Sequence, residues 1–402
     1  MAGLIPAIHA FSGNDGVRVD ARHKAGHDGS VAVATAMTDT YTPLRALIAE
    51  AGYAFVEPPL LHEANVYAEV AGEDLRRRMF LTSAGDGAEL ALRPDYTIPV
   101  CLAHLAGGAA KRKANYAYLG PVFRQRADAP SEFLQAGVES LGRADDVAAD
   151  ADVLKLAFGA AKLLGVARPS VRIGDSGLFA AVIEALDVSE PWRRRLARAF
   201  GAPDRLMALI AKASAQGAPA ATDVAAVALV GADRGTVRDV VAEMFASSGL
   251  GVIGGRTADE IADRFVEKSV LAEGIGERAA SVLTALLAIH GRPAKAIGQI
   301  ETLARGDKLA VGTAVDRFKE RLDQFTKRDI DLAKLTFAAD FGRRLDYYTG
   351  FVFEFHRGKR SAVGPIIGGG RYDRLMSLLG AKETVPAVGF AIWLDRLGGR
   401  TK

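Results

Sequence analysis

The chain has 402 residues, 49% hydrophobic and 25% charged, a composition typical of a soluble globular protein of one large or two to three ordinary domains. Its formal net charge of +3 is too small to indicate a nucleic-acid partner. No run of about 18 apolar residues predicts a membrane span, and the first residues lack a signal-peptide pattern. Cys101 is the only cysteine, so no intramolecular disulfide can form. We expect a reduced, cytoplasmic protein in which Cys101 is a packed residue.

Helix and strand signals alternate in the first part of the chain. Residues 1–30 are rich in Gly, Asp and His without periodicity, and we expect a loose leader. A helix is expected over 30–52, with its final glycine as the cap. A short strand at 53–60 ends at two prolines. Residues 79–95 have the pattern of a hairpin that turns at 84–87.

The middle of the chain changes from strands to helices. Strands are expected at 114–124 and 132–142, then a helix over 146–165 and a strand at 170–175. From about 189 to 328 the sequence is rich in Ala, Leu and charged residues at helical spacing. Three prolines interrupt this helical pattern, namely Pro203, Pro219 and Pro293.

Strand signals return near the end, at 335–341 and 351–355. A Gly-rich turn at 367–373, a helix and the apolar segment 385–397 follow. Strands, then helices, then strands predict an α+β fold whose core domain is interrupted by a helical insertion domain. The expected boundaries are 1–30 for the leader, 31–188 and 329–402 for the core, and 189–328 for the insertion.

The segment QAGVE lies in the second of the two middle strands. Residues two apart share a strand face, so Gln135, Gly137 and Glu139 point the same way. The amide and the carboxylate are then separated by about 13 Å of strand, at roughly 3.3 Å per residue. Such a face suits an amino-acid-sized ligand that is polar at both ends. The alternative is an ordinary solvent-facing strand face.

The segment LRPDYT offers a second polar group. If it is a strand, Arg93, Asp95 and Thr97 share one face. Asp95 could accept a hydrogen bond from an ammonium group, and Thr97 could donate or accept. A surface ion pair is an equally good interpretation.

The segment RRLDYYTG places two arginines and an aspartate before two tyrosines. Arg343 and Arg344 stand beside Asp346, and Tyr347 and Tyr348 carry hydroxyls on apolar rings, which suits the orientation of a ligand ring in a partly dry pocket. A core tyrosine pair with an external salt bridge is the alternative.

The segment GGGRYD (368–373) lacks the Lys-Ser/Thr of a phosphate-binding loop. We expect the backbone of a ligand or strand to approach it closely, with Tyr372 leaning in. The histidines show no metal-ligand spacing, and no HExxH, GxSxG or CxxC pattern is present. We therefore expect no metal and no cofactor.

Together these segments resemble the catalytic core of histidyl-tRNA synthetase, a class II aminoacyl-tRNA synthetase, over residues 35–397. EPPLLHEANVY is similar to the first class II motif, a dimer-interface element, and YLGPVFRQR with EFLQAGVESLG to the second. VPAVGFAIWLDRL is similar to the third. LRPDYT is similar to the family's LRPE-x-T segment, and RRLDYYTGFVFE and GGGRYDRL are similar to its two segments peculiar to histidine recognition. The resemblance implies an antiparallel sheet flanked by helices, with a helical insertion.

The resemblance also implies a histidine-binding set. The residues implied to hold the ammonium and carboxylate ends are Asp95, Thr97 and Gln135. Those implied to surround the imidazole are Glu139, Tyr347, Tyr348 and Tyr372. Arg343 matches the arginine that neutralises the carboxylate, and Arg124 matches the arginine of the second motif.

The segments that would bind ATP in the synthetases depart from the family pattern. Arg126 stands where an acidic residue is expected, and Trp393 stands where the third motif has a small glycine, so its indole should intrude on the adenine slot. Arg344 replaces a glycine beside Arg343. Arg396 is retained, and the few residues after it leave no room for an anticodon-binding domain, so no tRNA partner is expected.

This combination resembles the synthetase-like regulatory subunits of ATP phosphoribosyltransferase. It implies a non-catalytic homodimer, formed through the class II core, that binds short catalytic subunits in a hetero-oligomer. Those subunits would depend on it for activity, in the first step of histidine synthesis, and for feedback inhibition by histidine. One alternative is an active histidyl-tRNA synthetase core that activates histidine with ATP. Another is a paralogue that adenylates histidine for a different acceptor.

Overall fold

The computed structural model describes residues 40–70, 72–108, 112–127, 129–215, 234–247, 257–343, 347–358 and 364–397. The chain divides into two compact units, Met1–Ala46 and Leu47–Lys402. Helix α2 (Thr42–Glu50) crosses this division, and the elements that form the site belong to the second unit. The predicted leader lies outside the described residues.

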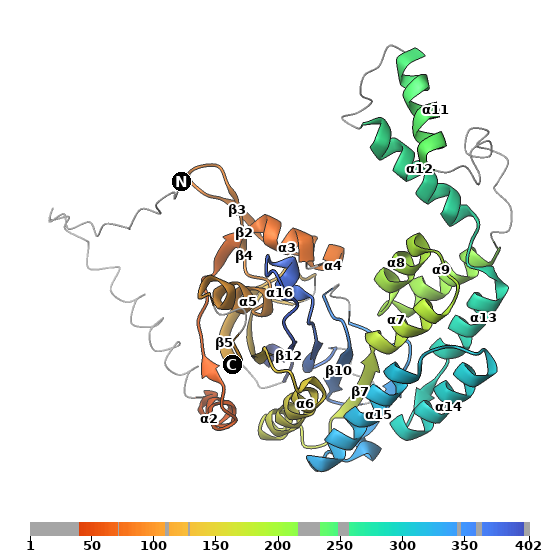
Figure 1. Cartoon of the computed structure of the whole chain (residues 1–402). Helices are drawn as coiled ribbons and strands as arrows, with labels where there is room; N and C mark the ends of the chain where they lie inside the picture. Colours follow the sequence, from red (N-terminus) through yellow and green to blue (C-terminus); the bar gives the residue numbers. More distant parts are fainter. Residues whose placement is uncertain are drawn as a thin grey trace, which may run out of the picture. The chain divides into compact units, whose positions relative to one another are not determined.

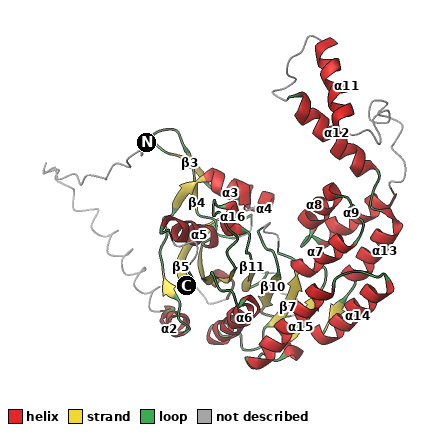
Figure 2. Ribbon diagram, viewed as in Figure 1, coloured by secondary structure: helices red, strands yellow, loops and turns green. Residues whose placement is uncertain are grey.

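Nine strands in the described part of the chain form one sheet (Figures 1 and 2). Two pairs are parallel, β1 with β5 and β7 with β9, and the other neighbouring strands pair antiparallel. The spatial order is β1 (Ala54–Phe55), β5 (Ala114–Phe123), β6 (Glu132–Leu141), β12 (Ala387–Trp393), β11 (Ile367–Arg371), β10 (Phe351–His356), β7 (Ser170–Asp175), β9 (Leu335–Ala338) and β8 (His290–Gly291). The predicted α+β arrangement around an antiparallel sheet is confirmed.

A smaller antiparallel sheet is formed by β2 (Leu61–Glu63), β4 (Glu89–Leu92) and β3 (Leu81–Ser83). The hairpin between β3 and β4 turns at 84–87 as predicted, with Gly87 at φ +88°. A left-handed backbone of this kind is adopted readily by glycine. Helices α3 (Ala64–Val70) and α4 (Gly72–Arg76) follow β2.

Helix α6 (Asp146–Leu163) packs on the main sheet, against β6, β11 and β12. The other described helices are α5 (Thr97–Ala106), α7 (Ser176–Ala185), α8 (Glu190–Ala199), α9 (Pro203–Ala215), α11 (Arg234–Ser247), α12 (Ala258–Ala272), α13 (Gly276–Leu287), α14 (Pro293–Gly306), α15 (Gly312–Lys327) and α16 (Leu375–Leu378), with 3-10 turns at Leu332–Lys334 and Leu394–Leu397. Pro203 and Pro293 begin helices, which suits their missing N–H. Pro219 lies outside the described residues. No described helix is long and apolar enough to cross a membrane.

The strand predicted for LRPDYT is wrong. Strand β4 ends at Leu92, and helix α5 begins at Thr97. Pro94 has no N–H for a strand ladder, and Asp95 accepts a hydrogen bond from the backbone N–H of Ile98 at 3.3 Å, at the start of the helix. Arg93 does not share a face with Asp95; it is fully buried and donates to the carbonyl of Pro58.

The turn predicted for the Gly-rich segment is also wrong, because Ile367–Arg371 forms strand β11. Its glycines serve close packing inside the sheet. A Cβ on Gly368 would collide with the guanidinium of Arg343, and one on Gly369 would lie 2.6 Å from the Cβ of Phe390. The close approach that was expected at this segment is therefore present, whereas the turn is not.

A buried ion network joins the sheet to the helices that cover it. Asp150 of α6 accepts hydrogen bonds from Arg371 at 2.7 Å and from Arg321 of α15 at 2.8 Å. Arg321 also donates to Asp175 at 2.7 Å, and Asp175 caps the N-terminus of α7 by accepting from the N–H of Gly177. All four charged side chains are buried, so each needs its partner to offset lost hydration.

Candidate functional site

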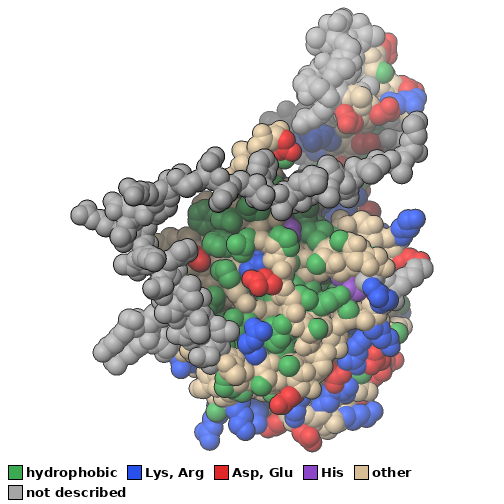
Figure 3. Space-filling view, turned by 90° about the vertical axis from the view of Figure 1, so that its left-hand side faces the viewer, with side chains coloured by type: hydrophobic (Ala, Val, Ile, Leu, Met, Phe, Trp, Pro, Cys, Tyr) green, Lys and Arg blue, Asp and Glu red, His purple; other side chains and the backbone are tan. Residues whose placement is uncertain are grey.

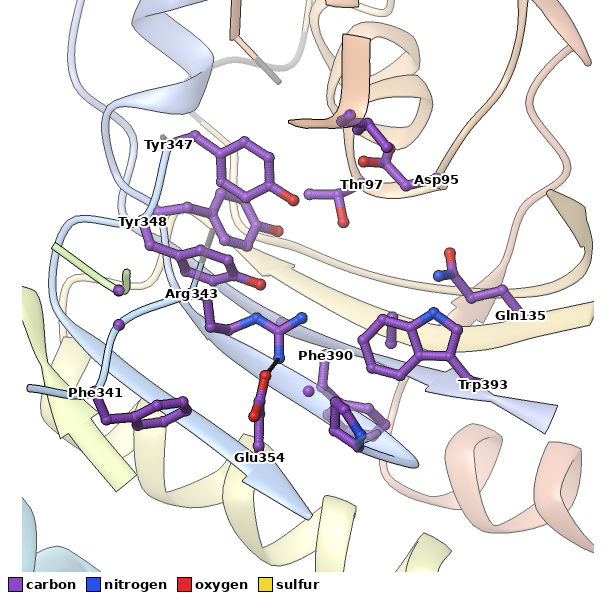
Figure 4. A pocket seen from close by; sticks show the side chains of 18 of the residues that line it. Asp95, Thr97, Gln135, Phe341, Arg343, Tyr347, Tyr348, Glu354, Phe390 and Trp393 are labelled. Carbon is purple, nitrogen blue, oxygen red and sulfur yellow. Dashed lines mark hydrogen bonds and ion pairs between the residues drawn. The ribbon is translucent and has the colours of Figure 1, made fainter. Parts of the chain in front are cut away.

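One pocket of about 380 Å³ brings together every predicted site residue (Figure 4). This volume lies at the small end of the usual range for small-molecule sites. The predicted residues in its wall are Asp95, Thr97, Arg124, Gln135, Glu139, Arg343, Tyr347, Tyr348 and Tyr372. Their role in binding histidine stays a prediction. Arg344 and Asp346 lie outside the described residues.

Glu139 of β6 is the most densely hydrogen-bonded acid in the pocket. Thr97 donates to its Oε1 at 2.7 Å, Tyr372 donates to its Oε2, and Tyr118 donates to Oε1 at 3.4 Å. Burial raises the pKa of Glu139 to about 8, although the hydrogen bonds from Tyr372 and Thr97 act in the opposite direction. A carboxyl group at this position can therefore gain or lose a proton near neutral pH.

Two acceptor oxygens in the wall have no hydrogen-bond partner among the described residues. They are Oδ2 of Asp95 and Oε1 of Gln135, on side chains that are almost fully buried. Burial raises the pKa of Asp95, and the nearby Arg124 opposes this shift. Unpaired buried acceptors cost free energy, so a ligand that donates to both would be stabilised there.

Tyrosines form one wall of the pocket (Figure 4). The rings of Tyr347 and Tyr348 lie 5.0 Å apart, and Tyr372 meets the ring of Tyr347 edge to face at 5.8 Å. Such ring contacts stabilise one another and restrict motion. The tyrosine pair is therefore packed, as one interpretation of the sequence held, and it also lines the pocket.

Arg343 projects into the pocket beside this wall. Its Nη1 donates to Glu354 of β10 at 3.0 Å, and its guanidinium carbon lies 5.5 Å from the ring centres of both Tyr348 and Trp393. Its Nε has no hydrogen-bond partner among the described residues. Arg343 is thus fixed in place while it keeps a donor for an anionic ligand group.

Trp393, Arg343 and Arg396 line another part of the pocket. The ring centre of Trp393 is 4.7 Å from the guanidinium carbon of Arg396 and 5.5 Å from that of Arg343, so the indole contacts two cations. Arg126 pairs with Asp395 at 2.7 Å. Burial lowers the pKa of Arg396 to about 10.

Sequence reasoning missed two residues that organise the pocket. Glu354 holds Arg343, and the signal was present, because it is a lone carboxylate inside the apolar strand FVFEF. Tyr118 supports Glu139 from the neighbouring strand, but nothing in ANYAYLG separated it from Tyr116. The prediction that Cys101 is a packed residue is confirmed, since it is fully buried and burial raises the pKa of its thiol.

Comparisons place the fold among known proteins. The family model described as histidyl-tRNA synthetase matches residues 27–250 and 260–397. A solved structure from Bacillus halodurans, described as an ATP phosphoribosyltransferase regulatory subunit/histidyl-tRNA synthetase, superposes with a TM-score of 0.60 at 22% identity, covering 89% of this chain and 78% of that one. Histidyl-tRNA synthetase from Nostoc sp. PCC 7120 gives a TM-score of 0.58 at 18% identity, covering 88% and 68%. The fold is therefore that of class II aminoacyl-tRNA synthetases, as predicted.

The sequence relatives are more specific. The chain is 41% identical over 346 residues to the ATP phosphoribosyltransferase regulatory subunit of Brucella ovis, covering 85% of this chain and 92% of that protein. The subunit of Brucella abortus (strain 2308) is equally similar, with 91% of its length covered. The chain belongs to the family of ATP phosphoribosyltransferase regulatory subunits, non-catalytic proteins of histidine biosynthesis that resemble histidyl-tRNA synthetase.

Proposed function

We propose that the pocket binds free histidine and that the chain thereby acts as the histidine-responsive regulatory subunit of an ATP phosphoribosyltransferase. One observation carries this proposal: the residues implied for histidine recognition, drawn from distant parts of the sequence, surround a single pocket. The pocket lining includes two unpartnered acceptor oxygens, a guanidinium group and a buried carboxyl group.

The chemistry of the wall fits the three polar groups of histidine. The unpartnered oxygens of Asp95 and Gln135 suit an ammonium group. Arg343, which keeps a free Nε, suits the carboxylate. Glu139 suits an N–H of the imidazole, with Tyr347 packed alongside.

Binding of histidine without its activation is the function that the pocket favours. Class II activation needs cations on the triphosphate and a flat slot for adenine. Trp393 occupies space between Arg343 and Arg396, and Arg126 is engaged by Asp395. These contacts oppose the alternative of a histidine-activating enzyme.

We further propose that the chain forms a homodimer and binds the short catalytic subunit. The small sheet and the segment before it expose Leu60, Leu61 and Leu81, each at 44–54% of its surface. Hydrophobic side chains gather on the face drawn in Figure 3, the left-hand side of Figure 1, where this sheet lies. Exposed apolar surface of this kind suits a subunit contact. Leu81→Asp should therefore increase the monomer fraction in sedimentation, and an unchanged dimer would contradict this contact.

Two further expectations stay part of the proposal. The cytoplasm suits a chain whose single cysteine is buried and unpaired.

We also propose that residues 189–328 form an insertion domain within a core built from 31–188 and 329–402, with α8 to α15 as its described helices.

Calorimetric titration of the isolated chain with histidine tests the ligand. Binding is expected with histidine, with a much weaker response to histidinol, which lacks the carboxylate that Arg343 would meet. Binding is expected to be lost with leucine, which cannot bond to Glu139. Equal affinity for histidine and leucine would contradict the proposed pocket chemistry.

Reconstitution tests the regulatory role. A short ATP phosphoribosyltransferase that is inactive alone should become active when this chain is added, and histidine should inhibit the mixture. Robust histidine-dependent exchange between ATP and pyrophosphate by the isolated chain would instead support the synthetase-like alternative.

A further inference from the structure

The loop that carries Arg343 meets the α8–α9 turn through two glycines. Gly201, between α8 and α9, has φ +85°, and a Cβ on it would lie 2.8 Å from the carbonyl carbon of Gly342. A Cβ on Gly342 would lie 3.0 Å from the Cα of Gly201 and 2.6 Å from Cδ1 of Phe200. The two backbones are therefore so close that no other residue fits at either position without a shift.

The turn at Gly201 is fixed by aromatic packing within the helical region. The ring of Phe200 stacks on Phe179 of α7 at 4.4 Å, with an interplanar angle of 19°. Phe179 is buried, and α8 packs against both α7 and α9. The turn that carries Gly201 is therefore packed against α7 by Phe200.

The loop on the other side of the contact leads directly into the pocket. Gly342 precedes Arg343, which is held by Glu354 and lies beside Trp393 (Figure 4). Phe341, the residue before Gly342, is anchored under the guanidinium of Arg172 at 4.7 Å. A displacement of Gly342 would therefore move the cation that we assign to the carboxylate of the ligand.

We propose that Gly201 and Gly342 are positioning residues of the pocket, through which the packing of α8 and α9 sets the affinity for histidine. The inference rests on the proposed function of the pocket. Coupling of this kind is reciprocal. If the packing of α8 and α9 changes the affinity for histidine, then histidine binding must change the stability of that packing.

Two substitutions test the contact by calorimetric titration with histidine. Gly201→Ala should weaken binding at least about fivefold, at the low end of usual coupling factors. Its matched control is Gly52→Ala, because Gly52 has the same φ of +85° with nothing within 4 Å of the added Cβ and does not line the pocket. The control suffers the same backbone strain, so it separates the effect of strain from the effect of the contact with Gly342. Its affinity for histidine should stay unchanged, because its added Cβ meets no neighbour.

A second pair avoids the pocket wall altogether, in case Gly201→Ala does not fold. Phe200→Ala removes a ring that does not line the pocket and should also weaken histidine binding. Phe158→Ala is its control. Phe158 lies on α6, away from α8 and α9, and its ring packs on Phe355 of β10 at 4.7 Å. Both variants should lose thermal stability, but only Phe200→Ala should change the affinity.

Hydrogen exchange of the wild-type chain provides the reciprocal measurement. Saturating histidine should slow exchange of amides in 196–206 and leave those around Phe158 unchanged. If the wild-type chain binds histidine but Gly201→Ala and Phe200→Ala bind it as tightly as their controls, the coupling is overturned and the proposed function stays intact. No histidine binding by the wild-type chain would overturn both.

Discussion

Thr97, the first residue of α5, donates a hydrogen bond of 2.7 Å to Glu139 near the end of β6. Tyr372 donates to the other carboxylate oxygen, so the acid is held by the start of α5 and by the residue that follows β11. The contact joins residues 42 positions apart and fixes the base of the pocket. The proposed role of this carboxylate as the imidazole partner can be tested directly.

Glu139→Gln should weaken histidine binding by about 10- to 100-fold at about pH 9, where the raised pKa of about 8 leaves Glu139 ionised, because a hydrogen bond to a charged group contributes about 1.5–3 kcal/mol. The amide keeps the volume of the side chain, so the fold should be retained. Glu132→Gln, at the exposed end of the same strand, is the control and should bind histidine as the wild type does. Calorimetry that gives the same dissociation constant for both variants would remove Glu139 from the site.

The pH dependence of stability gives a second test. The pKa of Glu139 is raised to about 8 in the folded chain, from an unfolded value near 4.5. The folded state then binds more protons than the unfolded state between these values, so this contribution is fully present below about pH 4.5 and is lost as the pH rises to about 8. Asp95, whose pKa is also raised by burial, acts with the same sign.

Thermal unfolding of the ligand-free protein should show this as a melting temperature that falls more steeply between pH 5 and 8 in the wild type than in Glu139→Gln. Asp95 remains in both proteins, so their difference isolates Glu139. Parallel melting curves across this range would show that Glu139 is already ionised in the ligand-free protein.

Trp393→Gly should not create a histidine-activating enzyme. Arg126 would still pair with Asp395, so the cation arrangement that activation needs would still be missing. The substitution should destabilise the fold by about 3–5 kcal/mol, because it removes a buried aromatic side chain. Histidine-dependent exchange of pyrophosphate into ATP, with an active histidyl-tRNA synthetase as positive control, should stay at background. Measurable exchange would show that Trp393 alone blocks activation.

Asp150→Asn should destabilise the chain strongly, by about 3–5 kcal/mol, because it leaves Arg321 and Arg371 buried without their shared carboxylate. Asp239→Asn removes one carboxylate that pairs with Arg238 at an exposed site and should change stability by less than about 1 kcal/mol. Urea unfolding compares the two. Similar urea midpoints for the two variants would show that water or rearranged side chains replace the contacts that Asp150 makes.

Strand periodicity predicted the parts of the site that lie on regular strands. Gln135 and Glu139 were placed on one face of β6 because that strand is long and its side chains alternate without interruption. The same rule failed at Asp95, because Pro94 ends the strand and the aspartate turns to the start of α5. Alternation cannot reveal where a strand stops when the breaking residue also fits a strand end.

Contacts between distant segments could not be predicted from the sequence at all. The meeting of Gly201 with Gly342 depends on how the α8–α9 turn packs against the sheet, and no local pattern encodes it. The glycines of β11 were interpreted as a turn because composition alone does not distinguish a turn from a strand crossed by a side chain such as Arg343. The family resemblance supplied the site residues where periodicity did not.

Histidine inhibition of the reconstituted phosphoribosyltransferase is the most direct measurement of the central claim. Complexes of the catalytic subunit with wild-type, Glu139→Gln or Glu132→Gln chains should all form and be equally active without histidine. We predict that, at about pH 9 where Glu139 is ionised, the Glu139→Gln complex needs at least about tenfold more histidine for half-inhibition, in line with its weakened hydrogen bond. Identical inhibition of all three complexes would contradict the claim that this pocket senses histidine.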